Sequence, residues 1–233
     1  MKKRTTNSIG NLVINLPFFL LLILGIALIF NNQIKSLLLI NQSQKYNLVN
    51  YSEKKLKDNW SKEGNFDFDS VEPVSNERVL KAQFKNLELP VIAGISIPSI
   101  NLSLPVFKGL DNSALLSGAG TMKPEQRLGE GNYALASHSV QNKTLLFSPL
   151  EFISVQQKIY LTDLKNIYTY KVNFKEKVDP TRVEFIDNIP QKKLLTLITC
   201  GDDEAKTRLI VQGELTDITN FNSTDKQTRS LFM

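Results

Sequence analysis

The chain is poor in the residue types that hold structural metals and disulfides: its 233 residues include one cysteine, Cys200, and one histidine, His138. A structural zinc site needs three or four such ligands, so we expect no metal centre. A single cysteine also excludes an intrachain disulfide, and an unpaired thiol in an exported chain indicates either reactivity or intermolecular pairing. The alternative interpretation is a buried, inert thiol, because free cysteine packs like a small hydrophobic residue.

Signals for nucleotide or nucleic-acid binding are also missing. The glycines at positions 118, 120, 129 and 131 follow neither the Walker spacing nor the dinucleotide-binding spacing. The net charge is only +5, and the lysines are scattered rather than gathered with aromatic residues, so we expect no nucleic-acid partner. With 42% hydrophobic and 22% charged residues, the composition is that of a folded globular protein.

Only one long hydrophobic run occurs, from Leu12 to Phe30, and it contains no charge. Its 19 residues come close to the ~20 that cross a bilayer core, so we expect a transmembrane anchor over residues 12–32. The basic residues at positions 2–4 favour a cytoplasmic N-terminus over residues 1–11, with the rest of this single-pass chain outside the cell membrane. A cleaved signal peptide has similar features, but no small-x-small cleavage site follows the run.

The rest of the chain divides by composition. Residues 33–86 are polar and carry several lysines, and we interpret them as an extracellular stalk whose lysines either meet anionic lipid or keep a linker solvated. Over residues 87–217, short β-rich runs alternate with Gly, Pro, Asn and Asp, which predicts an all-β sandwich or barrel. Residues 218–233 turn polar again, and we expect a C-terminal tail that frays. The predicted strands cover residues 90–98, 102–107, 133–137, 158–162, 167–174, 182–185, 194–199 and 207–214, and single helical turns cover 113–118 and 148–152.

Three chemically capable side chains stand at the ends of predicted strands. Cys200 and His138 each close a β-like run, and Arg208 lies at the start of the last strand. If the last two strands form a hairpin, Cys200 and Arg208 lie at the same end of the sheet. A thiol that attacks, an imidazole that moves protons and a cation that stabilises negative charge suffice for acyl transfer. Arginine at a strand start is otherwise a solvated rim residue, and a lone histidine is more often structural.

The surroundings and order of these residues narrow the chemistry. Acids at positions 202–204 follow Cys200 and oppose formation of the thiolate, whereas Arg208 favours it. His138 precedes Cys200 by 62 positions, whereas papain-like proteases place the cysteine first. Caspase-like enzymes share the order but require a Gln-Ala-Cys-x-Gly signature, which is absent.

The run Thr196-Leu197-Ile198-Thr199-Cys200, followed by Arg208, resembles the TLxTC…R signature of class A sortases, the membrane-anchored cysteine transpeptidases of Gram-positive bacteria. Further blocks resemble the class in the expected order, so that the resemblance covers roughly residues 87–216. These blocks are Gly94–Pro98, Leu104–Gly109, Gly118–Met122 and Gly131–His138. The resemblance implies a closed eight-stranded β-barrel with short helices, preceded by one N-terminal transmembrane helix.

The resemblance also implies a reaction. Sortases recognise a sorting signal of the LPXTG type and cut it between threonine and glycine. Cys200 would attack the threonine carbonyl to form a thioacyl-enzyme, and Arg208 would hold the substrate backbone and support the oxyanion. His138 would protonate the departing amine and then deprotonate the amine of a peptidoglycan precursor of the lipid II type. The expected partners are therefore LPXTG-type surface proteins, this precursor and the membrane.

The family's substrate groove and metal site carry over residue by residue. In some sortases calcium binds to acids before the histidine strand and in the segment after Pro180. Here the first region offers only Glu125 and Glu130, separated by Arg127, and the second has Asn188, so we expect no cofactor and no calcium dependence. The expected groove residues, which plain core positions would also explain, are Ala136, Val183, Phe185, Thr196, Leu197, Ile198 and Thr199.

Three other functions fit parts of the pattern. A membrane-tethered thiol protease needs the same thiol and imidazole but releases an acid instead of a new amide. A non-enzymatic extracellular β-barrel adhesion module needs neither group. A pilin-polymerising sortase of another class typically carries a second, C-terminal transmembrane segment and a lid before the histidine, whereas this chain has a polar tail.

Overall fold

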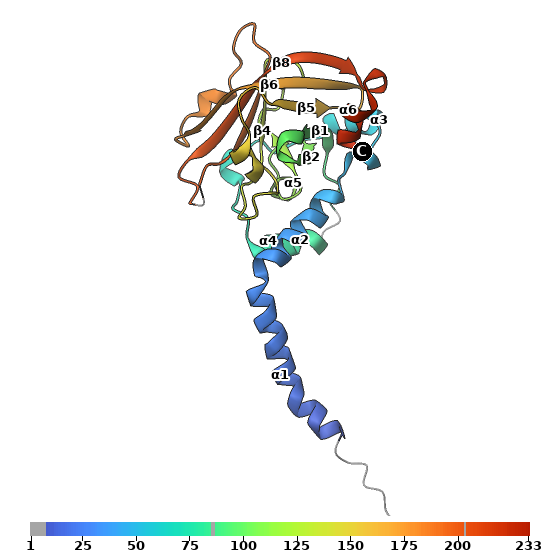
Figure 1. Ribbon diagram of the computed structural model, residues 1–233, viewed down its shortest axis with the longest axis vertical. Coiled ribbons are helices and arrows are strands. Elements are labelled where there is room, and N and C mark those ends of the chain that lie inside the picture. Colours follow the sequence, from blue (N-terminus) through green and yellow to red (C-terminus); the bar gives the residue numbers. More distant parts are fainter. Residues whose placement is uncertain (1–7, 85–86, 203) are drawn as a thin grey trace, which may run out of the picture.

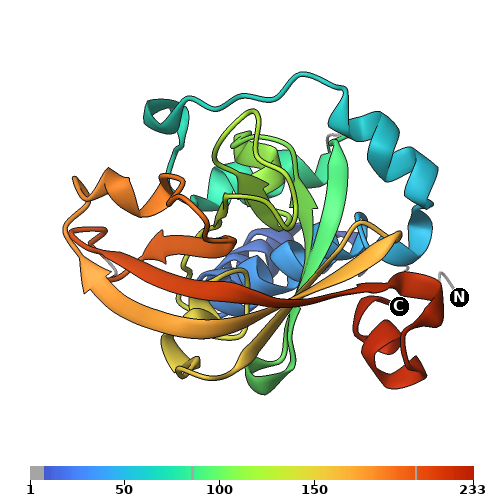
Figure 2. The same ribbon diagram turned by 90° about the horizontal axis from the view of Figure 1, so that it is seen from above.

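The computed structural model describes residues 8–84, 87–202 and 204–233, so the basic residues at positions 2–4 and Asp203 lie outside the described residues. Eight strands close into a barrel in the order β1-β2-β3-β4-β7-β8-β6-β5, which confirms the predicted fold (Figures 1 and 2). Two neighbouring pairs, β2 with β3 and β4 with β7, are parallel, and the others are antiparallel. The strands are β1 Val91–Ile97, β2 Leu102–Phe107, β3 Ala119–Thr121, β4 Asn132–Ala136, β5 Lys158–Thr162, β6 Asn166–Val178, β7 Leu194–Cys200 and β8 Arg208–Asn220.

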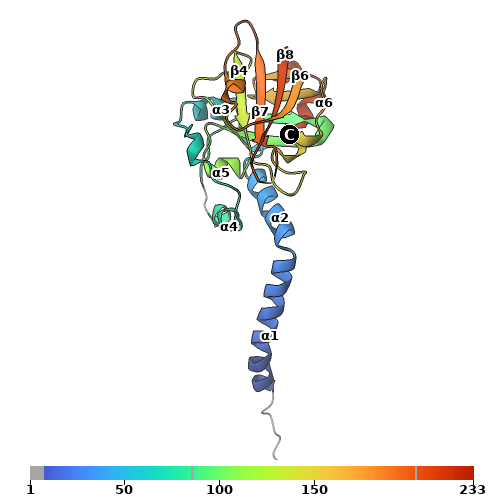
Figure 3. The same ribbon diagram turned by 90° about the vertical axis from the view of Figure 1, so that its left-hand side faces the viewer.

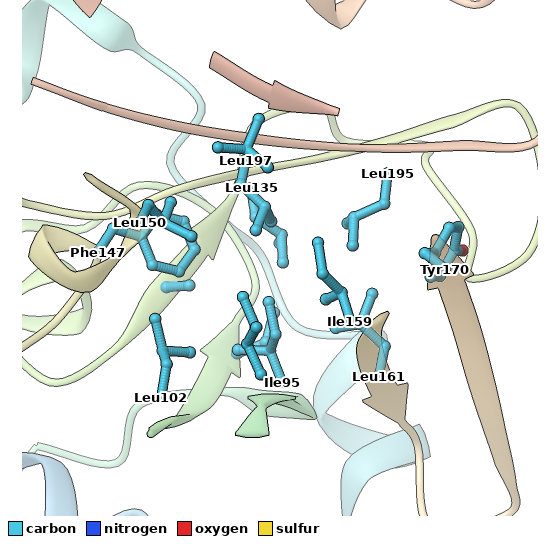
Figure 4. Packing of buried hydrophobic residues seen from close by; sticks show 14 of the residues in the cluster. Ile95, Leu102, Leu135, Phe147, Leu150, Ile159, Leu161, Tyr170, Leu195 and Leu197 are labelled. Carbon is cyan, nitrogen blue, oxygen red and sulfur yellow. The ribbon is translucent and has the colours of Figure 1, made fainter. Parts of the chain in front are cut away.

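The barrel interior is filled by one apolar cluster to which most of the strands contribute (Figure 4). Leu135, Leu195 and Leu197 point inward from β4 and β7 and are fully buried. Burial of each such side chain stabilises the fold by roughly 1.5–3 kcal/mol. Phe147 and Leu150 close one end of the barrel from the short helix η4 (Ser148–Phe152) and the residue before it. The rigid interior fixes which residues of β4 and β7 point outward.

One predicted strand is absent. The segment 182–185 forms a short 3-10 helix instead, η5 (Val183–Ile186). It begins after a turn in which the Thr181 N–H donates to Asp179 Oδ1 at 2.9 Å. The Phe185 carbonyl then accepts a hydrogen bond from the side chain of Asn132 at 2.8 Å. These tertiary contacts override the local β preference of valine and phenylalanine.

Residues 33–84 are docked on the barrel, although their composition predicted a stalk. Four helices cover the N-terminal part of the chain: α1 (Ser8–Ile29), α2 (Asn31–Gln44), α3 (Glu53–Trp60) and α4 (Asn76–Phe84). The buried Asn59 donates from Nδ2 to the Val91 carbonyl at 2.8 Å, and Leu48 packs so close to β1 that a Cβ at Gly94 would lie 2.5 Å from it. A few buried contacts between polar stretches thus hold the segment against β1 and β2.

Helix α1 projects away from the barrel, and its large apolar side chains from Phe18 onward are exposed (Figures 1 and 3). Among the residues that the structure describes, no single helix is long and apolar enough to cross a membrane. One pair of helical stretches, Pro17–Ile29 and Asn31–Asn50, meets those criteria jointly across a bend of 71°.

The C-terminal residues are folded, and the prediction that residues 218–233 fray is wrong. Strand β8 continues to Asn220, and two short helices follow, α6 (Lys226–Arg229) and η7 (Ser230–Phe232). Phe221 and Phe232 are buried in a cluster with residues of β1 and the N-terminal segment. Two phenylalanines among polar neighbours are enough to anchor the tail, because each buries a large apolar area.

Candidate active site

Strands β4 and β7 run side by side and in parallel, and their register places the residues that follow β4 next to the end of β7 (Figure 3). Paired residues, from Asn132 with Leu194 to Ala136 with Ile198, are 62 positions apart in the sequence. His138 and Cys200 are separated by the same 62 positions. Parallel neighbours lie about 4.8 Å apart across a sheet. The register therefore places His138 and Cys200 at neighbouring backbone positions at the same end of the barrel.

The predicted hairpin of β7 and β8 is confirmed, and Cys200 pairs directly with Arg208. The guanidinium of Arg208 donates from Nη1 to the carbonyls of Ala205 and Thr207 at 2.7 and 3.1 Å. Asp202 shapes the turn, since its carboxylate accepts hydrogen bonds from the Thr207 hydroxyl and from backbone N–H groups. These hydrogen bonds hold the pKa of Asp202 below its ordinary value, and the bond from the Thr207 hydroxyl has the largest effect. The hairpin thus places Cys200 and Arg208 opposite each other at the same end of the barrel.

Hydrogen bonds below the site hold the two strand ends together. The hydroxyl of the buried Thr199 donates to the Ser137 carbonyl at 2.8 Å, and the Ser137 hydroxyl donates to the Gly118 carbonyl at 2.7 Å. The Phe147 N–H donates to the His138 carbonyl at 3.1 Å and ties the loop after β4 to η4. The residues next to the thiol and the imidazole are thereby fixed by side-chain bonds between strands.

His138 sits in an environment that disfavours its charged form. Its Nε2 is shut off from solvent and has no hydrogen-bond partner among the described residues. Burial, followed by the charges of Arg78 on α4 and Lys35 on α2, lowers the pKa of His138 from 6.5 to about 4. A neutral ring at neutral pH can accept a proton as a base, and it becomes an acid once it is protonated.

The outer face of β4 and β7 carries an apolar surface that leads toward Cys200. Ala136 and Ile198 are paired on this face, with Ile186 of η5 and Val71 of the N-terminal segment beside them. We call this set the groove cluster, and its members are Val71, Leu110, Leu115, Met122, Ala134, Ala136, Ile186 and Ile198. Val71 and Ile186 were not predicted from the sequence, since only the tertiary fold brings them here.

A buried chain of polar side chains holds η5 against this face. Gln212 donates to Thr196 Oγ1 at 2.9 Å, and Thr196 donates to Asn132 Oδ1 at 2.7 Å. Asn132 then donates from Nδ2 to the carbonyls of Phe185 and Asp187 at 2.8 and 3.0 Å. Each of these polar side chains has a hydrogen-bond partner, so their burial costs little free energy. Asn132 is thus the residue that holds η5 in place, and its position at the start of a strand did not predict this role.

Several predicted groove residues lie elsewhere. The prediction for Leu197 is wrong, because strand alternation turns it into the barrel interior, where it is fully buried. Thr199 points to the same side of β7 as Leu197, and its hydroxyl bonds to the Ser137 carbonyl. Val183 is 69% exposed on η5, and the Phe185 ring stacks on Phe174 at 5.4 Å. Of the predicted set, Ala136 and Ile198 are half-buried on the outer face of the barrel, and Thr196 is fully buried within the polar chain that holds η5.

A lysine joins the segment before β4 to the segment after Pro180, the two regions compared above with the calcium sites of some sortases. Lys123, before β4, donates from Nζ to the Ile186 carbonyl at 2.7 Å and to Asn188 Oδ1 at 3.0 Å. Burial lowers its pKa, and the nearby charge of Asp187 opposes that shift. Within residues 8–84, 87–202 and 204–233, no group of three or more acids, histidines or cysteines is placed to hold a metal. The ammonium group of Lys123 links the segment before β4 to the segment around Asn188.

Comparison with known proteins agrees with this geometry. Residues 95–216 match the family model described as "Sortase domain". The chain is 43% identical to sortase A of Streptococcus agalactiae, over 99% of this chain and 95% of that protein. It is 37% identical to sortase A of Listeria monocytogenes, over 91% of this chain and 93% of that protein.

Solved structures give the same answer at the level of the fold. The crystal structure of Listeria monocytogenes sortase A superposes with a TM-score of 0.57 at 38% identity, over 61% of this chain and 96% of that one. Sortase C-1 of Actinomyces oris superposes with a TM-score of 0.54 at 24% identity, over 77% of this chain and 98% of that one, and supports the fold alone. With a matching domain over half its length and relatives that match it almost end to end, the chain belongs to the sortase family, as a class A cysteine transpeptidase.

Proposed function

We propose that Cys200, His138 and Arg208 are the catalytic residues of this transpeptidase. The observation that carries the proposal is the register of three adjacent strands. Parallel pairing of β4 with β7 brings His138 beside Cys200, and antiparallel pairing of β7 with β8 brings Arg208 opposite Cys200. Since the chain has no other cysteine or histidine, no second site can supply this chemistry.

The reaction follows from the chemistry of these groups. The imidazole of His138 takes the thiol proton of Cys200 as the sulfur attacks the threonine carbonyl of the sorting signal, and the guanidinium of Arg208 stabilises the negative charge on oxygen. His138 gives its proton to the leaving amine as the threonine–glycine bond breaks, and a thioester remains on Cys200. The neutral imidazole then takes a proton from the incoming amine, which attacks the thioester. A new amide forms and the thiol is released.

We propose that the groove cluster receives an LPXTG-type signal of a surface protein. Ala136 and Ile198 form an apolar floor, and η5 forms a wall whose position is fixed by Asn132 and Thr196. An apolar floor with a few fixed polar groups suits an extended peptide that carries leucine and proline. Val71 covers part of this surface and has to yield when the peptide binds.

Product analysis tests the proposed function. Purified full-length chain is incubated with an LPXTG-type peptide, with and without an amine such as oligoglycine. We expect cleavage between threonine and glycine, a thioacyl adduct on Cys200 by mass spectrometry, and amide product well above free acid when amine is present. Free acid alone would indicate a thiol protease, and no cleavage would favour an adhesion module.

We propose that the reaction does not depend on calcium, because Lys123 links the loops that calcium joins in some relatives. Replacing Lys123 with methionine leaves the Ile186 carbonyl and Asn188 without their donor and loosens η5. We expect KM for the sorting peptide to rise about fivefold to tenfold, since a hydrogen bond from a charged group contributes roughly 1.5–3 kcal/mol and this one is only partly buried. The turnover number kcat should change little, because the thiol and the imidazole are untouched.

The control for this prediction is Lys158→Met, which removes an exposed lysine on β5. Steady-state kinetics are measured for both variants and the parent chain, each with added calcium and with chelator. A parent chain that is activated by calcium, or a Lys123→Met variant with unchanged KM, contradicts the proposal.

We also propose the cellular arrangement. Residues 12–32 anchor the chain in the membrane with residues 1–11 in the cytoplasm, and residues 87–217 form the extracellular catalytic barrel. The exposed apolar side chains of α1 support the anchor. Residues 33–86 connect the two as a stalk, of which residues 33–84 fold back on the barrel, and residues 218–233 pack against β1 and the N-terminal segment. The amine acceptor is then a lipid-linked peptidoglycan precursor, which shares the membrane surface with the enzyme.

A further inference from the structure

A second hollow, separate from the groove cluster, lies where α1 meets the folded domain. It has a volume of about 510 Å³ and runs between α2 and the loop that follows His138. Helices α2 and α4 lie at the base of the barrel, on the side from which α1 extends (Figures 1 and 3). Its lining residues are Asn32, Gln33, Lys35, Ser36, Leu37, Leu39, Ile40, Val140, Gln141 and Asn142. We call it the juxtamembrane groove.

The chemistry of this groove is that of a site for a sugar-bearing phosphate. Lys35 provides a cation that forms no ion pair within the described residues and donates only to the Val74 carbonyl, at 3.3 Å. Amide side chains of Asn32, Gln33 and Gln141 stand around it, and such groups bind the hydroxyl and amide groups of carbohydrate and peptide. No acid lines the groove. A phosphate is therefore attracted and no carboxylate repels it.

The groove runs along the loop that follows His138. Val140 and Gln141 lie two and three residues after His138, and the Val140 N–H is fixed by the Ser148 hydroxyl at 2.7 Å. The charge of Lys35 reaches His138, since it is one of the causes of the low pKa of that ring. A molecule seated beside Lys35 thus lies against the loop that follows His138. The donor peptide takes the outer face of β4 and β7, so the two substrates do not compete for space.

We propose that the juxtamembrane groove binds the lipid-linked amine acceptor, with its phosphate on Lys35 and its sugar and peptide part on the amide side chains. This inference rests on the proposed function and on the proposed anchor. The lining of the groove begins at Asn32, the last residue of the proposed anchor, so the groove lies close to the membrane surface at which a membrane-bound precursor exposes its diphosphate. Its volume is within the range of roughly 300–1,000 Å³ that is typical of ligand sites. A phospholipid head group would need the cation but not the row of amides.

The test compares two acceptors in the full-length chain reconstituted in vesicles. One acceptor is the lipid-linked peptidoglycan precursor, and the other is a soluble oligoglycine. The measured quantity is the ratio of the two rates of amide formation, with the same sorting peptide as donor. For Lys35→Gln we expect this ratio to fall about tenfold, because only the lipid-linked acceptor carries a phosphate. For Gln141→Ala we expect a smaller fall, and for the exposed Lys54→Gln on α3 no change.

Three other results of this experiment would contradict either the proposed acceptor site or the proposed function. If Lys35→Gln slows transfer to both acceptors equally, Lys35 acts through His138 or the fold, and the proposal is overturned. If the ratio holds while binding to precursor-free vesicles of phosphatidylglycerol weakens, the groove is a phospholipid site, and the proposal is also overturned. If the parent chain transfers to neither acceptor although it is folded, the proposed function itself fails.

Discussion

Replacing Cys200 with alanine is expected to abolish both cleavage of the sorting peptide and amide formation. The loss should be roughly 10⁴-fold or more in kcat/KM, the scale seen when a nucleophile is removed from a covalent mechanism. No other thiol exists in the chain to replace it. Cys200 lies at the end of β7 and is only partly buried, so the barrel loses little packing. Cleavage kinetics and mass spectrometry of the acyl adduct measure the effect.

A matched experiment separates catalysis from stability. The melting temperature of Cys200→Ala should lie within a few degrees of the parent's, whereas Leu197→Ala, three residues earlier and fully buried, should lower it by far more. Alkylation of the parent chain should modify Cys200 alone and abolish activity in step with labelling. Cys200→Ala that keeps more than about one per cent of the activity would exclude the covalent mechanism.

Much of the fold follows from local patterns in the sequence. Short runs of alternating or apolar β-formers bounded by turn residues predicted seven of the eight strands near their observed positions, and missed the three-residue β3. The hairpin of β7 and β8 was predicted because Gly201 and its charged neighbours form a turn between two such runs. That pairing, together with the scarcity of cysteine and histidine, was enough to bring Arg208 to Cys200. Local signals are strong where a strand, a turn and the next strand are adjacent.

The features that failed all depend on contacts distant in sequence. The segment 182–185 has β-forming residues, yet its carbonyl is taken by Asn132, more than fifty positions earlier. The motif predicted Leu197 as a groove residue, but its orientation depends on which face of β7 is turned toward the barrel interior. Val71 reaches Ala136 and Ile198 only because the N-terminal segment folds back. Composition alone predicted a stalk there, since few apolar residues are needed to dock it.

Replacing His138 with glutamine is expected to lower kcat for transfer by roughly 10³–10⁴-fold, because the chain has no other imidazole to carry the proton to and from the amines. KM for the sorting peptide should change little, since His138 lies beyond the apolar floor formed by Ala136 and Ile198. Single-turnover kinetics with a more reactive ester donor, whose leaving group needs no proton, should recover part of the acylation rate. A His138→Gln variant with near-parental transfer would remove His138 from the mechanism.

The same substitution has a second expected effect, on stability in acid. The pKa of His138 is about 4 in the folded chain and 6.5 in an unfolded one, so the unfolded state binds the proton first as the pH falls. Stability is complete above pH 6.5 and falls between pH 6.5 and 4, by about 3 kcal/mol from this group. His138→Gln should lose less stability over that interval in urea titrations. Since His138 is the only histidine, one imidazole signal in an NMR titration reports its pKa, which should rise in Arg78→Gln because a nearby positive charge is removed.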